Sequence, residues 1–239
     1  MTLRNEKKIV LTREQYFVLS TRMRGLLQAD PHMPSPDGYF IASLYFDDQY
    51  ETAYYEKLSG KDYRRKYRVR LYNGDTSFIR LECKEKYGDK IGKRSEPIGL
   101  KTYEGLTRGD FRALSEETGP LAREVYALTQ AKGLAPKVAV TYRREAYLHP
   151  LSTTRITFDK ELRAGWGSAA LLSQEAESFA AFPAPDYPYD NAVILEIKYD
   201  EYLPRFVADA LQTGGQLLAA SKYVLCRDRL FTFGKPYTK

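Results

Sequence analysis

The sequence predicts an α+β protein in which eight mostly antiparallel strands close into a barrel or tunnel, with helices at its periphery. Three observations lead to this prediction. Most of the chain alternates apolar and polar residues with the two-residue period of strands; helix signals occur only between those segments; and charged residues recur at alternate positions of several strands. The length of 239 residues suits one domain, residues 1–239, and a hydrophobic content of 43% is enough for a packed core.

Eight segments have the strand pattern and are rich in β-branched or aromatic residues. They are Lys7–Leu11, Tyr39–Phe46, Lys66–Tyr72, Phe78–Tyr87, Lys93–Leu100, Lys137–Tyr147, Thr154–Asp159 and Ala192–Tyr199. The sequence Asn73-Gly74-Asp75 lies between the third and the fourth segment and is a strong hairpin signal. Eight such strands with peripheral helices fit a closed barrel better than a doubly wound sheet.

Four helices are predicted in the gaps between strands. Thr12 and Gln15 form a capping box, and the helix that they begin continues to about Leu27. The other three are predicted to begin at Thr107 with Asp110, at Pro120 and at Pro204, the last of them ending near Gly214-Gly215. The proline-rich segment Phe182–Asp190 is interpreted as a loop.

Composition excludes several classes of protein. No segment approaches the run of about 18 apolar residues that a spanning helix needs, so membrane insertion is not expected. Residues 1–9 are followed by no apolar stretch, which argues against a signal peptide and predicts a cytoplasmic protein. Cys83 and Cys226 are too few for a disulfide framework, and His32 and His149 are too few for a zinc site. Any metal is expected to be Mg²⁺ or Mn²⁺ held by carboxylates.

Three predicted strands share the same small pattern of an acid, one intervening residue and a lysine. The pairs are Glu6 and Lys8, Glu82 and Lys84, and Glu196 and Lys198. Since residues i and i+2 of a strand project from the same face, each strand places an acid beside a base. Other strands add Arg68, Arg70, Arg144, Arg155 and Asp159. Around Glu82 and Glu196 the alternate residues, such as Cys83 and Ile197, are apolar, so the opposite face of these strands is predicted to pack in the core.

The charged face has two interpretations. An exposed Glu–Lys pair on a strand is usually a solvated surface feature that contributes less than about 1 kcal/mol. In a barrel closed with the charged face inward, confined cations would lose hydration, at a cost of several kcal/mol per ion, unless a polyanion compensated them. Arg binds phosphate oxygens in a bidentate manner, so a phosphate chain is a suitable polyanion. The net charge of +6, from 37 basic and 31 acidic residues, permits both interpretations.

A series of short segments then identifies a family. The segments are Arg4-Asn5-Glu6-Lys7-Lys8, Ser43-Leu44-Tyr45-Phe46-Asp47-Asp48, Lys66-Tyr67-Arg68-Val69-Arg70, Ile79-Arg80-Leu81-Glu82-Cys83-Lys84, Tyr142-Arg143-Arg144-Glu145-Ala146-Tyr147, Arg155-Ile156-Thr157-Phe158-Asp159, Leu195-Glu196-Ile197-Lys198-Tyr199-Asp200 and Ser221-Lys222-Tyr223. In this order they resemble the polyphosphate polymerase domain of the vacuolar transporter chaperone (VTC) family, within the triphosphate tunnel metalloenzymes. The resemblance covers most of the chain.

The resemblance implies an eight-stranded antiparallel tunnel and assigns roles to its charged residues. It implies Lys8, Arg68, Arg70, Lys84, Arg144, Arg155, Lys198 and Lys222 as phosphate contacts. Of these, Arg68, Arg70, Lys84 and Lys198 are predicted to neutralise the transferred phosphoryl group, and Lys8, Arg144, Arg155 and Lys222 are predicted to bind the rest of the substrate. Glu196 is the implied main carboxylate for Mn²⁺ or Mg²⁺, with Glu6 beside it.

The implied function is a metal-dependent phosphotransferase that passes the γ-phosphoryl group of ATP to a growing polyphosphate chain. Its partners are ATP and inorganic phosphate or polyphosphate, with a membrane protein as a possible further partner. The superfamily's hydrolases usually begin with E-x-E-x-K, but Arg4 stands where their first Glu would be. This departure removes one potential metal ligand and resembles the polymerase branch more than the triphosphatases.

Three alternatives remain open: a triphosphatase, a non-catalytic polyphosphate-binding module, and a nucleic-acid-binding protein. The last is not expected, because no strand carries the aromatic motif of an RNA-binding sheet. Two basic segments are ambiguous. Gly92 to Glu96 lacks the spacing of a phosphate-binding loop, and Arg94 within it is predicted to face either the tunnel or the surface. Lys61 to Lys66, at a strand entrance, is interpreted as a solvated turn in preference to a site, with the steering of anions to a tunnel mouth as the alternative.

Overall fold

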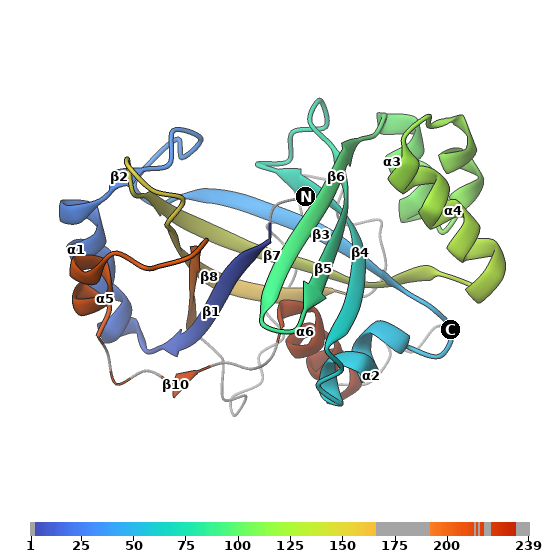
Figure 1. The fold of residues 1–239 in the computed structure, drawn as a ribbon. Helices are drawn as coiled ribbons and strands as arrows, with labels where there is room; N and C mark the ends of the chain where they lie inside the picture. The colour runs from blue at the N-terminus through green and yellow to red at the C-terminus, as the bar shows by residue number, and fades with distance from the viewer. Residues whose placement is uncertain (1–2, 166–191, 213, 215, 218–220, 233–239) are drawn as a thin grey trace.

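Eight antiparallel strands close into a barrel (Figure 1). The computed structural model describes residues 3–165, 192–212, 214, 216–217 and 221–232. The barrel strands are β1 (Arg4–Leu11), β3 (Tyr39–Asp47), β4 (Tyr63–Tyr72), β5 (Arg80–Tyr87), β6 (Lys90–Pro97), β7 (Ala135–Leu148), β8 (Arg155–Gly165) and β9 (Val193–Tyr199). Their order is β1-β6-β5-β4-β3-β7-β8-β9, and β9 pairs again with β1, which confirms the predicted closed eight-stranded barrel.

Two short strands lie outside this circle. β2 (Gln28–Ala29) pairs with β7, and β10 (Gln216–Leu217) pairs with β1. A tight turn forms at the predicted place after β4: Asn73 and Gly74 both have positive φ, at 52° and 69°, and Asp75 N donates to Tyr72 O at 2.9 Å. The connection from β4 to β5 is longer than a two-residue hairpin loop, because residues 73–79 lie between the two strands. β5 begins at Arg80, two residues later than expected, and β6 ends at Pro97, because proline has no N–H to continue the ladder.

Four helical segments lie close to their predicted positions. α1 (Arg13–Leu26) begins at the predicted capping box, with Thr12 N donating to Gln15 Oε1 at 2.9 Å. α4 (Pro120–Lys132) begins at Pro120, and α5 (Arg205–Ala210) follows Pro204 but ends well before Gly214. The prediction that a helix begins at Thr107 was wrong. Thr107 ends α3 (Leu100–Thr107), and Asp110 instead caps the short 3₁₀ helix η1 (Phe111–Glu116) by accepting from Arg112 N at 3.1 Å.

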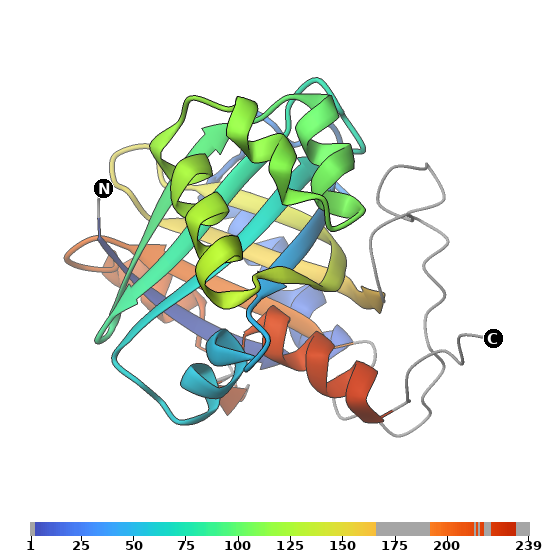
Figure 2. The same cartoon turned by 90° about the vertical axis from the view of Figure 1, so that its right-hand side faces the viewer.

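Two helices that were not predicted, α2 (Thr52–Leu58) and α6 (Lys222–Thr232), lie together below the barrel in Figures 1 and 2. The side chain of Asp47, at the end of β3, accepts from Ala53 N at 2.9 Å and Tyr54 N at 3.0 Å and so begins α2. The predicted loop Phe182–Asp190 lies outside the described residues.

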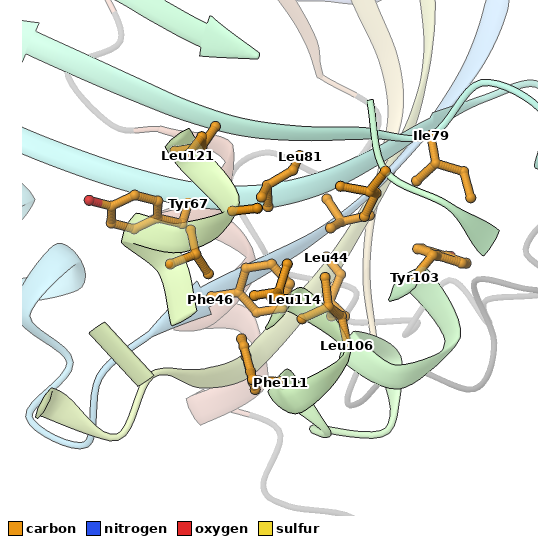
Figure 3. Packing of buried hydrophobic residues seen from close by; sticks show 14 of the residues in the cluster. Leu44, Phe46, Tyr67, Ile79, Leu81, Tyr103, Leu106, Phe111, Leu114 and Leu121 are labelled. Carbon is orange, nitrogen blue, oxygen red and sulfur yellow. The ribbon is translucent and has the colours of Figure 1, made fainter. Parts of the chain in front are cut away.

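The hydrophobic core lies mainly between the outer surface of the barrel and the helices. One cluster packs Leu44, Phe46 and Leu81 against Leu106 and Leu114 of the α3–η1–α4 segment (Figure 3), and those helices cover β4, β5 and β6 in Figure 2. A second cluster lies under α1 and α5. Each such side chain contributes about 1.5–3 kcal/mol when fully buried. Because the apolar strand positions are used on the outside, the charged positions point into the barrel.

Candidate active site

The barrel encloses a cavity of about 1060 Å³ that is lined by side chains from all eight barrel strands and from α2 and α6. Lys and Arg are far more numerous in its wall than Asp and Glu. The cations are Arg4, Lys8, Lys57, Arg64, Lys66, Arg68, Arg70, Lys84, Lys86, Lys93, Arg144, Arg155, Lys198 and Lys222. The lining acids are Glu6, Asp30, Asp75, Asp89 and Glu196.

All the residues predicted for phosphate or metal binding reach this one cavity. The eight predicted phosphate contacts and the two predicted metal carboxylates, Glu6 and Glu196, are in its wall. They come from strands far apart in the sequence, and barrel closure brings them together. The structure therefore places the predicted site in one enclosed space, whereas the part that each residue plays there stays a prediction.

Glu6 lies at the meeting point of three strands. Antiparallel pairing of β1 with β9 sets Glu6 opposite Lys198 and Lys8 opposite Glu196, so that acids and bases alternate. Glu6 also accepts from Lys84 Nζ of β5 at 2.6 and 2.8 Å, and Lys8 Nζ lies 3.1 Å away. Burial opposes ionisation of Glu6, but Lys8 and Lys84 outweigh it and hold its pKa well below the usual range. Glu6 is therefore a carboxylate.

Glu196 is the second cavity carboxylate and has a denser set of cations around it. Its oxygens lie 2.6 Å from Lys222 Nζ, 3.2 Å from Arg144 Nη2 and 3.4 Å from Lys198 Nζ. Burial again opposes ionisation, and Lys222, Lys198 and Arg144 together lower the pKa of Glu196 well below normal. Asp159 completes this group by accepting from Arg144 at 2.6 and 2.7 Å and by pairing with Lys222.

Arg68 and Arg70 are positioned by β4 on the same inward face but have different partners. Arg68 donates twice to the fully buried Glu82, at 2.6 and 2.8 Å. Arg70 instead donates to two neutral oxygens, Ser43 Oγ and Tyr142 OH, both at 3.0 Å. Arg70 therefore has its orientation fixed while most of its charge remains available to an anion.

Arg155 lies in another part of the cavity. It donates to Asp30 at 2.6 Å and to Tyr39 OH at 3.0 Å, while its buried Nε has no hydrogen-bond partner among the described residues. Asp30 comes from the segment that follows β2, and no pattern in the sequence places it beside β8. This partner was missed because only the tertiary structure brings the two segments together.

The interpretation of Lys61 to Lys66 as a solvated turn was wrong from Tyr63 on, where β4 begins three residues before the expected strand start at Lys66. Arg64 and Lys66 belong to β4 and line the cavity. The signal was present, because both residues continue the two-residue period of Arg68 and Arg70 toward the N-terminus. The ambiguity at Arg94 is also resolved. Arg94 points away from the cavity and pairs with Glu85 at 2.7 Å and with Glu124 of α4 at 2.6 Å.

The donor set of the cavity fits a divalent cation only if phosphate supplies most of the ligands. Among the described residues, no group of three or more His, Cys, Asp or Glu side chains forms a cage for a metal ion. Glu6 and Glu196 are ionised and reach the same cavity from paired strands. Mg²⁺ is commonly bound through one or two carboxylates together with substrate phosphates, and two carboxylates match that arrangement.

Comparison with known proteins places the chain in a family. The VTC domain family model matches residues 3–231. The chain belongs to the VTC domain family. No curated protein is significantly similar in sequence to this VTC domain.

Solved structures with some similarity to this chain were found. HpAC1 from Hippeastrum is 13% identical to this VTC domain, with a TM-score of 0.57 and coverage of 96% of each chain. HpAC1 was assigned as an adenylyl cyclase and is described as having a dominant triphosphatase activity. The PH1012 protein of Pyrococcus horikoshii is also 13% identical, with a TM-score of 0.47 and coverage of 93% of this chain and 98% of its own. At 13% identity the likeness to HpAC1 concerns the fold alone.

Within the described parts of this VTC domain, no helix combines the length and the apolar character needed to cross a bilayer. The cytoplasmic location stays a prediction.

Proposed function

We propose that this VTC domain is a polyphosphate polymerase that transfers the γ-phosphoryl group of ATP to a growing polyphosphate chain inside the barrel. The observation that carries the proposal is an enclosed cavity whose cations greatly outnumber its carboxylates. Enclosed cations repel one another and lose hydration, which costs several kcal/mol per ion unless counter-charge is present. A chain of phosphates supplies that charge along its whole length. Membership of the VTC domain family supports the same substrate class.

Phosphoryl transfer depends on positioning and charge stabilisation more than on covalent chemistry with the protein. In the proposed reaction, a terminal oxygen of phosphate or of the growing chain bonds to the γ-phosphorus of ATP. The bond from that phosphorus to the β–γ bridging oxygen breaks, and ADP leaves. Arg68, Arg70, Lys84 and Lys198 would neutralise the oxygens of the group in transit. Lys8, Arg144, Arg155 and Lys222 would hold the flanking phosphates.

A divalent cation is the expected cofactor, since triphosphate tunnel proteins depend on one. Glu196 and Glu6 would hold it together with phosphate oxygens, and Mn²⁺ or Mg²⁺ is the proposed identity. When bound, the ion would supply positive charge that offsets the negative charge of the phosphate groups. The lysines around both glutamates keep these carboxylates ionised and correctly placed before substrate arrives.

The test is the purified protein with ATP and either Mn²⁺ or Mg²⁺, assayed for polyphosphate and ADP together. Arg70→Ala is expected to lower polyphosphate synthesis by about 100-fold, the usual cost of removing one transition-state donor. Glu196→Gln, which keeps the shape of the side chain, is expected to abolish the metal-dependent rate. Both should keep the fold, as followed by circular dichroism. Unchanged synthesis in both variants would refute the assignment.

The same assay separates the alternatives. A triphosphatase would release orthophosphate from ATP or tripolyphosphate without chain growth. A binding module would retain polyphosphate in a filter or calorimetric assay but form neither ADP nor product. A possible membrane partner is proposed only from the family resemblance.

A further inference from the structure

Two tyrosine hydroxyl groups in the cavity wall accept hydrogen bonds from the inward-facing arginines of β4. Arg68 Nη1 donates to Tyr45 OH of β3 at 2.7 Å, and Arg70 Nη2 donates to Tyr142 OH of β7 at 3.0 Å. Both tyrosines are buried, and both line the cavity. The two arginines that are proposed to neutralise the transferred phosphoryl group are thus each joined to a neutral hydroxyl.

The direction of these bonds leaves the hydroxyl hydrogens unused. A guanidinium can only donate, so each tyrosine oxygen is the acceptor, while the phenol still carries one hydrogen of its own. Among the described residues, no oxygen accepts the hydroxyl hydrogen of Tyr45 or of Tyr142. Because both side chains line the cavity, these two hydrogens are available to an acceptor inside it.

The charges around Tyr45 make its hydroxyl a stronger donor than an ordinary phenol. Burial would raise the pKa of Tyr45, but Arg68, Arg70 and Lys222 outweigh burial and lower this pKa below its usual value. The guanidinium of Arg68 also lies over the ring of Tyr45, 5.5 Å from the ring centroid. A hydroxyl of this kind is suited to a hydrogen bond with a negatively charged oxygen.

Cations flank the ring of Tyr142 as well. The guanidinium of Arg144 lies 5.3 Å from its centroid, and Lys222 Nζ lies 4.9 Å away. The ring is therefore held between groups of the cavity wall, with its hydroxyl directed to Arg70. The position of the unused hydrogen is fixed before any substrate arrives.

We propose that Tyr45 and Tyr142 are catalytic residues that donate hydrogen bonds to the oxygens of the phosphoryl group during its transfer. The proposal rests on the proposed function and adds two neutral donors to its cations. Negative charge spreads over the equatorial oxygens of the group in transit, and positioned donors stabilise that charge. A hydroxyl does so without adding to the repulsion among the cavity cations, which a further Lys or Arg would increase.

The experiment measures kcat and KM for polyphosphate synthesis from ATP in Tyr45→Phe and Tyr142→Phe of the full chain. Each variant removes one hydroxyl and keeps the ring. Each is expected to lower kcat by about 100-fold, the usual cost of one transition-state donor. KM for ATP should change by less than about threefold, because the lost bond forms mainly in the transition state.

Displacement of an arginine is the competing explanation, and the structure supplies a control for each variant. In Tyr45→Phe, Arg68 is still held by its two bonds to Glu82, at 2.6 and 2.8 Å. Ser43→Ala is the matched control for Tyr142→Phe, since Ser43 Oγ accepts from Arg70 at 3.0 Å but does not line the cavity. It should lower kcat by no more than about fivefold, the value of one neutral hydrogen bond.

The proposal is overturned if either phenylalanine variant, shown to be folded by circular dichroism, keeps the wild-type kcat. It is also overturned if the loss in Tyr142→Phe is no larger than that in Ser43→Ala, because the hydroxyl would then act only by orienting Arg70. A rise in KM with kcat unchanged would make the hydroxyls ground-state binding groups and would contradict it too. A wild-type protein that forms no polyphosphate from ATP would refute the proposed function itself, which is a separate outcome.

Discussion

Arg68 and Arg70 show how two equivalent side chains of one strand face come to differ. Glu82, fully buried on β5, neutralises Arg68 at 2.6 Å but lies 3.9 Å from the guanidinium of Arg70. Arg70 is instead oriented by hydroxyl groups, which fix its position without cancelling its charge. Arg68 therefore contributes mainly to barrel structure in the free protein, and Arg70 is the more available cation of the two.

At Lys66, phosphate binding is predicted to be coupled to proton uptake. The pKa of Lys66 is depressed in the free folded protein, so the group stabilises the fold only above its unfolded pKa, and this contribution is lost as the pH falls through the folded value. A bound polyanion favours the ammonium form and raises the pKa, so the complex binds protons and its affinity falls as the pH rises. The groups that face Lys66 are Lys8, Lys84, Lys57 and Arg64, with Ser221 as its hydrogen-bond acceptor.

Calorimetry at one pH in two buffers of different ionisation enthalpy measures this proton uptake directly. The enthalpy with long-chain polyphosphate should differ between the buffers, and the difference should shrink in Lys66→Met. The same difference in both proteins would show that other groups, such as Lys198, whose pKa burial lowers to about 8, take up the protons.

At the scale of elements, Asp47 joins three parts of the fold around the cavity. It ends β3, accepts from the first backbone amides of α2, and accepts from Tyr223 OH of α6 at 2.7 Å. α2 carries Lys57, and Lys222 precedes Tyr223 on α6. One buried carboxylate thus positions cavity cations that lie on two separate helices.

Asp47→Asn is predicted to lower both stability and activity. The amide retains one acceptor oxygen in place of two, so the cap of α2 and the bond to Tyr223 cannot both be kept. The expected loss of unfolding free energy is about 1–2 kcal/mol, the value of a helix cap, and polyphosphate synthesis should fall because Lys222 is displaced. Chemical denaturation and the polymerase assay measure the two effects.

Asp110→Ala, which removes the capping oxygen, is the control for this prediction, since Asp110 caps η1 and does not line the cavity. It should affect stability without reducing the activity of the folded protein. Wild-type activity in Asp47→Asn, together with a stability loss like that of the control, would show that Asp47 acts on the fold alone.

The whole molecule is a barrel whose polar face points inward and whose apolar face is covered by helices. The outer clusters supply the hydrophobic stabilisation, while the cavity concentrates positive charge. The packing of the helices on the outer face of the barrel stabilises the fold, whereas the cations inside the cavity repel one another. Its stability is therefore expected to depend strongly on the anion in the cavity.

Polyphosphate is predicted to raise the melting temperature by about 5–10 °C at a concentration 100 times its dissociation constant. Ligand binding then contributes about 2.7 kcal/mol, and each kcal/mol shifts the melting temperature by about 2–4 °C in a protein of this size. Differential scanning fluorimetry measures the shift. Sulfate at equal ionic strength should give much less, and an equal shift with sulfate would mean that general screening, not the filled cavity, is responsible.

Much of the architecture was predictable because strand alternation is a local property. The positions of Glu6, Glu82, Glu196 and their lysines on one face follow from the two-residue period, and the capping box at Thr12 and the turn at Asn73 follow from short-range chemistry. The helices α2 and α6 were missed because the bonds that hold them, from Tyr223 to Asp47 and from Tyr54 to Asp228, join residues far apart in the sequence. Arg64 was assigned to a turn because a basic run looks the same on a turn and on an inward strand face.

The sequence by itself determined which side chains share a strand face, that the chain belongs to an antiparallel barrel class, and which charged residues are candidates for the site. Only the tertiary structure decided that the charged face is the inner one, which cations are neutralised, and which are left unpaired. The physical reason is that alternation is symmetric with respect to the two faces of a sheet. Which face becomes the interior, and which cation lies opposite an acid, depend on barrel closure and register, and both are set by contacts between distant strands.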